Sequence, residues 1–447
     1  MGRKQYERPM LKRIVPTMPG KTGQNVVVAS QSEIDGVGLD CLRSRFGSPL
    51  FVFSERTLRK NVREAVRAFS TRYPDVRFAW SYKTNYLNTV CRIFHEEGSM
   101  AEVVSGFEYD KALANGVPSN LIIFNGPAKS EQDLLRAIEG DSLIHIDNTE
   151  ELRILTNLSI EKNIKPRVAL RVNMDVGIYP PWNRFGFNLE SGQAWDALEK
   201  IASEGKLNCV GLHCHIGTFI QTADAYRIEA EKLSLLAKDA MEKLGLPIAY
   251  VDMGGGFASK NTLKSSYLTG EDLCPTFDDY AETITSVFRT TKFPGGKKLK
   301  IILETGRALV DNAGFLLASV ITNKRMADGR LNTVIDAGVN LLFTSFWYNH
   351  KVTTTYENTS QVEPTMLCGP LCMNIDVIRD NVMLPPLKRN DLLLIHNVGA
   401  YNVTQWMQFI MMRPKVVMVQ ENGEVVLLRD AECMNDVNRL EEQCSII

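Results

Sequence analysis

The chain has 447 residues, of which 44% are hydrophobic and 23% are charged, and its 51 basic and 52 acidic residues give a formal net charge of −1. This composition is typical of a soluble globular protein, and because no apolar run reaches about 18 residues we expect no membrane span. The balanced charge gives no electrostatic reason to expect a nucleic-acid partner, so the expected partner is a small molecule. The length allows one α/β barrel and a smaller second domain.

The chain ends and the cysteines indicate a cytoplasmic protein. Nine scattered cysteines, an odd number, predict reduced thiols, and their spacing predicts no structural zinc or other metal site. The C-terminal Cys444-Ser445-Ile446-Ile447 matches a prenylation signal only loosely. The N-terminal arm has no signal-peptide-like apolar stretch, and we interpret it as a solvated tail that carries Arg3, Lys4, Arg8, Lys12 and Arg13.

Eight short strand-like runs follow one another through the first two-thirds of the chain. Segments with helical spacing of apolar residues lie between them, for example at 87–94, 106–114, 130–138 and 222–244. Alternating strands and helices predict a parallel α/β fold, and eight such units predict a (β/α)8 TIM-like barrel. The runs are residues 78–82, 101–104, 121–125, 143–147, 168–173, 210–216, 250–254 and 300–304.

The sequence changes in character on either side of this barrel. Residues 48–53 predict a strand that leads into a helix over 57–69, with Ser54 as its capping residue. From Gly314 onward, strand-like runs with Gly, Pro and Asn-Gly punctuation predict a mainly antiparallel β-domain. We therefore assign three segments: an N-terminal arm that contributes to the β-domain (1–47), the barrel (48–310) and the C-terminal β-domain (311–447).

Polar residues gather where four of the predicted strands end. In barrels the reactive groups lie at the carboxyl ends of the strands and in the loops that follow. The first strand ends at Lys83, the sixth at His215, the seventh at a run of three glycines, and the eighth at Glu304 and Arg307. These strand ends meet at one mouth, which predicts an active site there.

Each of these residues has a chemical and a purely structural explanation. A partly desolvated lysine forms a Schiff base with an aldehyde cofactor, although a lysine after a strand can also simply reach solvent. Three glycines let backbone N–H groups approach a phosphate, or form an ordinary turn. Glu304 and Arg307 are either a surface pair or ligands of a ring nitrogen and a phosphate, and His215 is either a core histidine or a plate over a planar cofactor.

The order of these motifs resembles the alanine-racemase-like (fold type III) pyridoxal phosphate decarboxylases, the group of diaminopimelate and ornithine decarboxylases. The resemblance extends from about Pro49 to Arg429 and implies pyridoxal 5'-phosphate as cofactor and a β-domain like the C-terminal domain of alanine racemase. The matching motifs are Lys83, His215-Ile216-Gly217-Thr218, Gly254-Gly255-Gly256-Phe257, Glu304-x-Gly-Arg307, Cys372 and Gly399-Ala400-Tyr401, with Arg184-Phe185-Gly186, Val334-Ile335-Asp336-Ala337-Gly338 and Arg413-Pro414.

The resemblance also implies a role for each residue. Lys83 forms the internal aldimine, His215 stacks on the pyridine ring, and Glu304 keeps the ring nitrogen protonated so that the ring accepts the electrons left at Cα by departing CO2. Cys372 reaches the active site from the partner subunit and protonates Cα, which implies a homodimer with shared active sites. The other implied cofactor contacts are Thr218, Gly254, Gly255, Gly256, Gly306, Arg307 and Tyr401, and the supporting residues are Glu102, Ser105, Glu108, Arg171 and Asp376.

Two departures from the family pattern concern the substrate. Diaminopimelate decarboxylases have an arginine for a substrate carboxylate shortly after the Asp-Ala-Gly motif, whereas here Asn340 is followed by Leu341-Leu342-Phe343-Thr344. The acidic residue that reads a distal amino group after the family's cysteine is replaced by Met373. Losing one member of a buried charge pair costs about 2–5 kcal/mol. We therefore expect a modified or carrier-tethered amino acid of secondary metabolism as the substrate.

Three alternatives remain open. The protein is a diaminopimelate or ornithine/lysine decarboxylase proper, with other residues in place of the missing arginine and acid; or a pyridoxal-dependent amino-acid racemase, which also forms a Cα carbanion; or a non-catalytic cofactor-binding regulator. Racemases lack the Cys372 arrangement and place a tyrosine opposite the lysine. The joint presence of Lys83, His215, Glu304 and Arg307 argues against a regulator. We therefore predict a pyridoxal-phosphate-dependent carboxy-lyase.

Overall fold

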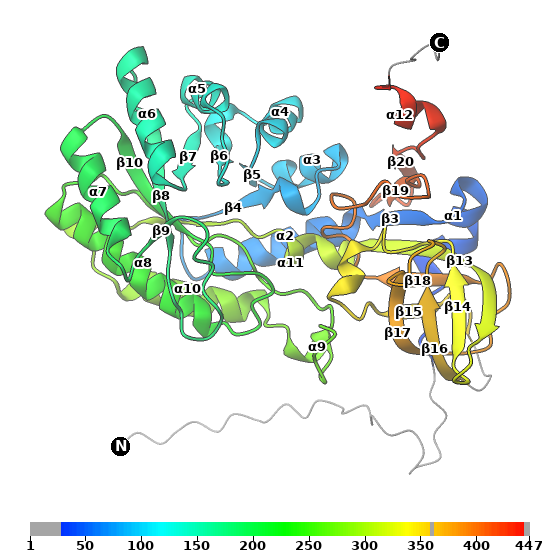
Figure 1. The fold of residues 1–447 in the computed structure, drawn as a ribbon. Coiled ribbons are helices and arrows are strands. Elements are labelled where there is room, and N and C mark those ends of the chain that lie inside the picture. Colours follow the sequence, from blue (N-terminus) through cyan, green and yellow to red (C-terminus); the bar gives the residue numbers. More distant parts are fainter. Residues whose placement is uncertain (1–27, 358–361, 442–447) are drawn as a thin grey trace, which may run out of the picture.

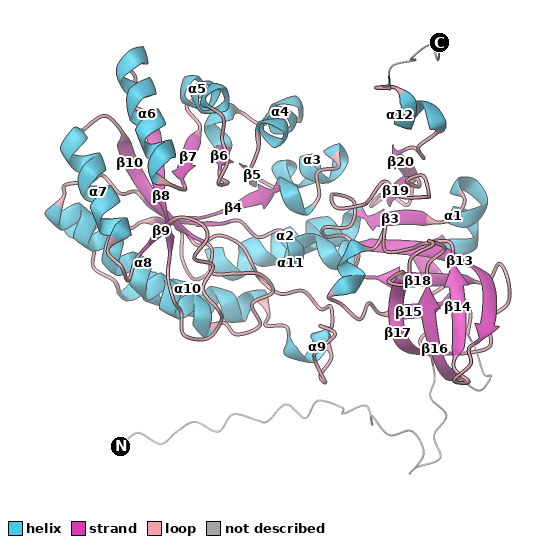
Figure 2. Cartoon of the chain, in the orientation of Figure 1, coloured by secondary structure: helices cyan, strands magenta, loops and turns pink. Residues whose placement is uncertain are grey.

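The computed structural model describes residues 28–357 and 362–441, and the basic N-terminal residues and Cys444 lie outside these ranges. A barrel surrounded by helices lies beside a β-domain made mostly of strands (Figures 1 and 2). In the described ranges no helix is long and apolar enough to cross a membrane. The eight cysteines found there are all free thiols.

The predicted barrel is confirmed, and all eight predicted runs are strands. Each strand is parallel to its neighbours, and the pairing of the last strand with the first closes the ring. A two-residue strand that was not predicted, β9 (Phe187–Asn188), extends the edge of the fifth barrel strand. The barrel strands are β4 (Val76–Ser81), β5 (Met100–Val103), β6 (Ile122–Phe124), β7 (Leu143–Ile146), β8 (Arg167–Asn173), β10 (Asn208–Cys214), β11 (Tyr250–Asp252) and β12 (Lys300–Leu303).

Helices alternate with the strands, and most of them cover the outside of the barrel (Figure 2). The predicted cap of the first of them is confirmed, because the Ser54 hydroxyl accepts a hydrogen bond from the Thr57 backbone N–H at 3.0 Å. The helices are α2 (Glu55–Ser70), α3 (Asn88–Glu96), α4 (Gly106–Ala114), α5 (Glu131–Glu139), α6 (Thr149–Lys162), α7 (Gln193–Glu204), α8 (Asp224–Lys243), α9 (Gly270–Leu273), α10 (Phe277–Thr290) and α11 (Arg307–Val310).

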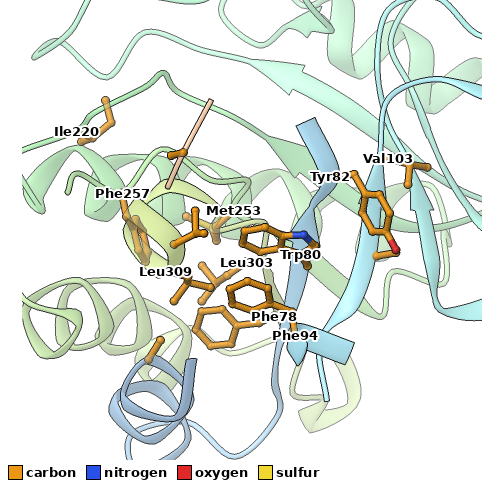
Figure 3. Packing of buried hydrophobic residues seen from close by; sticks show 14 of the residues in the cluster. Phe78, Trp80, Tyr82, Phe94, Val103, Ile220, Met253, Phe257, Leu303 and Leu309 are labelled. Carbon is orange, nitrogen blue, oxygen red and sulfur yellow. The ribbon is translucent and has the colours of Figure 1, made fainter. Parts of the chain in front are cut away.

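Aromatic packing between β4 and the helices around it fixes the position of that strand. The rings of Trp80 and Phe94 stack with centroids 3.8 Å apart, and Phe78 meets Phe69 edge to face at 5.6 Å. Figure 3 shows Phe78, Trp80 and Phe94 close to Leu303 of β12. Burying each such side chain stabilises the fold by about 1.5–3 kcal/mol. The end of β4, where Lys83 lies, is thereby held rigidly.

The β-domain is a mainly antiparallel sheet, as predicted. Its strands run in the order β17-β16-β14-β13-β3-β19-β20, with β18 paired to β13 and β15 paired to β18. Helix α1 (Leu39–Phe46) packs on this sheet, and α12 (Met434–Asn438) follows it. The strands are β3 (Leu50–Ser54), β13 (Gly314–Arg325), β14 (Leu331–Ile335), β15 (Val352–Thr354), β16 (Glu363–Cys368), β17 (Val377–Leu384), β18 (Leu392–His396), β19 (Val416–Val419) and β20 (Val425–Arg429).

One strand lies elsewhere than the sequence suggested. Residues 48–53 were assigned to the barrel segment, yet β3 pairs antiparallel with β13 and parallel with β19 inside the β-domain. All five residues of β3 are buried, so the apolar run predicts a central strand but does not identify its sheet. The strands that pair with β3 come more than two hundred residues later in the chain, and no local sequence pattern predicts such a pairing.

A fully buried acid lies between α8 and the barrel wall. Glu229 of α8 has no exposed surface, and Cys214 of β10 lies beside it. Burial raises the pKa of Glu229 well above its ordinary value, and the negative charge of Glu304 adds to this, whereas the thiol of Cys214 acts in the opposite direction. Burial thus favours the protonated, uncharged form of Glu229.

We expect Glu229→Gln to gain stability relative to the wild type as the pH rises. The folded wild type binds the Glu229 proton more tightly than the unfolded chain, so its stability falls once the pH exceeds about 4.3, by up to about 1.4 kcal/mol per pH unit. Glutamine has no such proton to lose. Chemical denaturation at pH 5.5 and pH 8.5 measures the change, with the exposed Glu231→Gln of the same helix as control. An equal difference at both pH values would contradict the assignment.

Candidate active site

A cavity of about 860 Å³ opens at the carboxyl ends of the barrel strands and reaches residues of the β-domain. Its size lies within the range of about 300–1,000 Å³ that small-molecule and cofactor sites occupy. The β-domain contributes Trp347, Tyr348, Tyr401 and Gln405 to its lining. The predicted site residues that line it are Lys83, Glu102, Arg171, His215, Thr218, Gly255, Gly256, Glu304, Gly306, Arg307 and Tyr401.

Lys83 projects into this cavity from a 3-10 turn (Tyr82–Thr84) directly after β4. Its Nζ lies 2.5 Å from Oε2 of Glu102, which is buried and also accepts a hydrogen bond from Ser81. Burial alone lowers the pKa of Lys83, but the carboxylates of Glu102 and Glu304 outweigh it and hold that pKa above its ordinary value. A carboxylate is therefore in place to take the ammonium proton when the lysine reacts as a nucleophile.

Glu304 lies at the end of β12 within a buried polar group. The Asn125 amide donates to one of its oxygens, and Nε2 of His213 lies 3.3 Å from the other. The possible ligand atoms of His145, His213 and Glu304 all lie within 4.8 Å of one another, so by distance they could hold a metal ion. Burial lowers the pKa of both imidazoles well below the ordinary value. Neutral imidazoles thus flank the carboxylate that faces the cavity.

Arg307, the first residue of α11, forms a buried cationic site. The side chain is 8% exposed, and the guanidinium lies 4.6 Å from the ring centroid of Tyr401 and 5.2 Å from that of Tyr348. Within the described ranges its Nη1 has no hydrogen-bond partner. Asp311 is nearby, but it accepts hydrogen bonds from Ser259 and Asn261 instead. A buried cation without a paired anion is costly, so this position suits an anionic ligand.

The glycine run after β11 brings backbone close to the same region. Gly254 and Gly256 have φ values of +59° and +103°, which side-chain-bearing residues rarely adopt. A Cβ on Gly255 would collide with the carbonyl oxygen of Glu304, and the N–H of Gly255 donates to Nδ1 of His215 at 3.2 Å. A reactive lysine, an unpaired arginine and a glycine-rich turn in one cavity fit an aldehyde that carries a phosphate. The residues present therefore fit pyridoxal phosphate.

Several predicted site residues lie outside the cavity lining of the chain. Ser105 caps α4 by accepting from the N–H of Glu108, and burial, aided by Glu102, raises the pKa of Glu108 to about 7. Gly254 lies behind the lining. Cys372 is exposed on the β-domain, on a turn in which buried Asp376 accepts backbone hydrogen bonds from Val339 and Leu371 at 2.7 Å each. The catalytic role of Cys372, the cofactor contact of Gly254 and the supporting roles of the others remain predictions.

The cavity also contains residues that were not singled out. Asn125 ends the third predicted strand and His213 precedes His215 by two residues, so the rule that places reactive groups at strand ends could have found both. Arg184 belongs to the Arg-Phe-Gly motif but was given no role. Phe185 belongs to the same motif. No short motif marks the other polar and aromatic ones, which are Ser81, Tyr179, Trp182, Phe219, Gln221, Trp347, Tyr348 and Gln405.

The fold and the cavity define the class of protein: an enzyme with a lysine-bound aldehyde cofactor on a (β/α)8 barrel joined to a β-domain. The chain belongs to the pyridoxal-dependent decarboxylases, because residues 59–311 match the family described as "Pyridoxal-dependent decarboxylase, pyridoxal binding domain". It is therefore a pyridoxal 5'-phosphate-dependent amino-acid decarboxylase, and the predicted carboxy-lyase activity and cofactor are confirmed.

Relatives and solved structures agree with this family. The diaminopimelate decarboxylase of Aquifex aeolicus is 28% identical over 408 residues, covering 89% of this chain and 93% of the relative. The crystal structure of diaminopimelate decarboxylase from Methanocaldococcus jannaschii superposes with a TM-score of 0.84 at 28% identity, covering 94% of this chain and 98% of that one. The lysine/ornithine decarboxylase of Vibrio vulnificus, 21% identical with a TM-score of 0.72 over 86% of this chain and 98% of that one, shares the fold.

We expect Lys83→Ala to abolish covalent attachment of the cofactor, because in the described ranges Lys83 is the lysine that lines the cavity. Borohydride reduction followed by intact-mass measurement should show the cofactor mass on the wild type and not on the variant. Lys60→Ala, on the exposed face of α2, is the control and should label like the wild type. A labelled Lys83→Ala would refute the assignment.

Proposed function

We propose that this decarboxylase acts on a free amino acid whose long side chain ends in a polar group, with diaminopimelate as the first candidate. The observation that carries the proposal is the size and lining of the cavity, about 860 Å³, in which Lys83 and the cofactor-binding residues are joined by residues of the β8–α7 segment and of the β-domain. The relatives named above, which match 89% of the chain or more, act on diaminopimelate according to their names. The expected tethered substrate of secondary metabolism has no such support.

A second candidate keeps one specific observation in its favour. Thr344 is the polar residue of the run Leu341-Leu342-Phe343-Thr344, in which the family's carboxylate-binding arginine is missing, and its hydroxyl lies 2.9 Å from both Nε2 of His350 and Oδ1 of Asn402. The side chain is buried in the β-domain and does not line the cavity. Met373 likewise offers no charge to an ammonium group. These two residues favour a modified or carrier-bound amino acid over a free diamino acid.

The chemistry divides between the cofactor and the chain. Pyridoxal phosphate, when bound, supplies an aldehyde that joins to amines and a ring that draws electrons from Cα as CO2 leaves. We assign the phosphate to Arg307, Thr218, Tyr401 and the glycine run, the ring face to His215, and the ring nitrogen to Glu304. Glu102 holds the proton that Lys83 gives up at Nζ, and the burial of this carboxylate strengthens the interaction.

We propose further that the enzyme works as a homodimer in which Cys372 of one subunit protonates Cα in the other. Cys372 is exposed and does not line the cavity of its own chain, so only a second subunit brings it to a reacting atom. Ile375, on the same turn, is 56% exposed, and a subunit interface would cover this apolar side chain. The buried carboxylate of Asp376 holds the turn in place.

A substrate screen tests the proposed function. We expect cofactor-loaded protein to release CO2 from diaminopimelate, and less efficiently from lysine, ornithine and arginine, because these lack the second carboxylate. Gas evolution in a sealed vessel and the mass of the product measure the reaction. Carrier-bound amino acids belong to the same screen, and turnover of those alone would replace the first candidate by the second.

Mixing two inactive variants tests the shared active site. Lys83→Ala and Cys372→Ala should each be inactive or strongly impaired. If each site combines Lys83 of one subunit with Cys372 of the other, mixed dimers contain one intact site, so co-refolded protein should recover about a quarter of the wild-type activity. Native mass spectrometry, which separates the mixed dimer from the two homodimers by mass, supplies the control for subunit exchange. No recovery despite exchange would place both residues in one chain or remove Cys372 from the mechanism.

A further inference from the structure

The segment between β8 and α7 forms one wall of the cavity at its solvent-exposed side, which we call the outer end. Tyr179, Trp182, Arg184 and Phe185 of this segment all line the cavity. The wall is anchored at both ends: the amide of Asn173 donates to the carbonyl of Phe185 at 2.7 Å, and the hydroxyl of Tyr179 accepts from the backbone N–H of Gln221 at 3.0 Å. A surface segment held in this way presents its side chains at defined positions.

Arg184 is the charged residue of this wall. Its guanidinium lies 4.5 Å from the ring centroid of Phe185, and the guanidinium of Arg171 lies 4.7 Å from the same ring. Arg171 forms an ion pair with Asp147 at 3.2 Å. Arg184 has no ion pair or hydrogen bond to the part of the chain that the structure describes. An aromatic ring orients the guanidinium of Arg184, as is common for such groups, and its N–H groups are free to donate hydrogen bonds to a ligand.

The charges around the cavity are distributed unevenly between its two ends. Glu102 and Glu304 are the acidic side chains in its lining, and both lie at the inner end, next to Lys83 and His213. Among the lining cations, Lys83 and Arg171 are paired, and Arg307 lies among the rings that surround the cofactor's phosphate site. The outer end therefore presents one unpaired cation, Arg184, and no acid within the described ranges.

We propose that Arg184 binds a carboxylate at the distal end of the substrate and determines specificity for that group. This inference rests on the proposed function, and it names the residue that takes over from the arginine missing after Asn340. A planar guanidinium accepts a carboxylate through two parallel hydrogen bonds. Tyr179 and Trp182 beside it offer apolar faces to the methylene chain of such a substrate. A distal ammonium group of a substrate would find no acidic partner at this site and would lie near the positive charge of Arg184.

Three substrates of matched length separate the two charges. 2-Aminopimelate has the distal carboxylate without the distal amino group, lysine has the amino group without the carboxylate, and diaminopimelate has both. We expect kcat/KM for 2-aminopimelate to equal or exceed that for diaminopimelate and to exceed that for lysine about tenfold or more. Arg184→Gln should raise KM for the two carboxylate substrates by a similar factor, with little change in kcat, and leave lysine unaffected. Arg184→Lys should restore part of the loss.

A binding measurement keeps this inference separate from the catalytic proposal. Pimelate, a dicarboxylate without an amino group, should bind the holoenzyme and change the fluorescence of Trp182, and Arg184→Gln should weaken this binding about tenfold. Arg92→Gln, on an exposed face of α3, is the matched control and should behave as the wild type. Equal turnover of lysine and 2-aminopimelate, unchanged by Arg184→Gln, would overturn the inference while leaving decarboxylation intact. If no amino acid released CO2, the proposed function would fail, and pimelate binding alone would decide the role of Arg184.

Discussion

The pairing of β12 with β4 closes the barrel, and the arrangement of the site depends on it. Leu303 stands opposite Phe78 in this pairing, so the residues that follow the two strands, Glu304 on one and Lys83 on the other, enter the same cavity. Aromatic packing of Trp80 and Phe94 beneath β4 keeps the strand from shifting. The negative charges of Glu102 and Glu304 act on the amine of Lys83 because the closed ring holds them close to it. An open sheet with the same residues would place them at opposite edges.

Several charged side chains are buried in and near the site. Some are paired with an opposite charge, one carboxyl group is favoured in its protonated form, and one cation is left for a ligand. Glu102 is paired with Lys83, and Glu304 is flanked by neutral histidines and the amide of Asn125. For Glu229, behind the barrel wall, burial raises the pKa and favours the protonated form. Arg307 is buried among aromatic rings, and within residues 28–357 and 362–441 no acid is hydrogen-bonded to it. An unpaired buried charge lowers the stability of the ligand-free protein, and binding of an oppositely charged ligand removes this cost. Sites that are preorganised for an anion commonly have this property.

The barrel, its eight strands and most of the inner site could be predicted from sequence, because strand periodicity and the strand-end rule are local signals. Lys83, His215, Glu304 and Arg307 all lie at or shortly after the end of a predicted strand. The place of β3 could not be predicted, since its buried run pairs with strands far along the chain. The cavity wall between β8 and α7 could not be predicted for a related reason. Tyr179, Trp182 and Arg184 lie in a loop whose path depends on contacts with Asn173 and Gln221. Strands such as β17, which carries several charged and polar residues, lack the apolar signature.

The position of β3 has a consequence for how the chain assembles. β3 is made before the barrel, whereas its neighbours β13 and β19 are made after it. During synthesis this apolar strand therefore has no sheet to join until the barrel is complete, and its second neighbour is present only once Val419 has been added. The chain runs from the β-domain into the barrel and back to the β-domain, so a single cut in a linker does not separate the two domains. The β-domain side of the cavity, with Tyr348 and Tyr401, is consequently the last part of the active site to form.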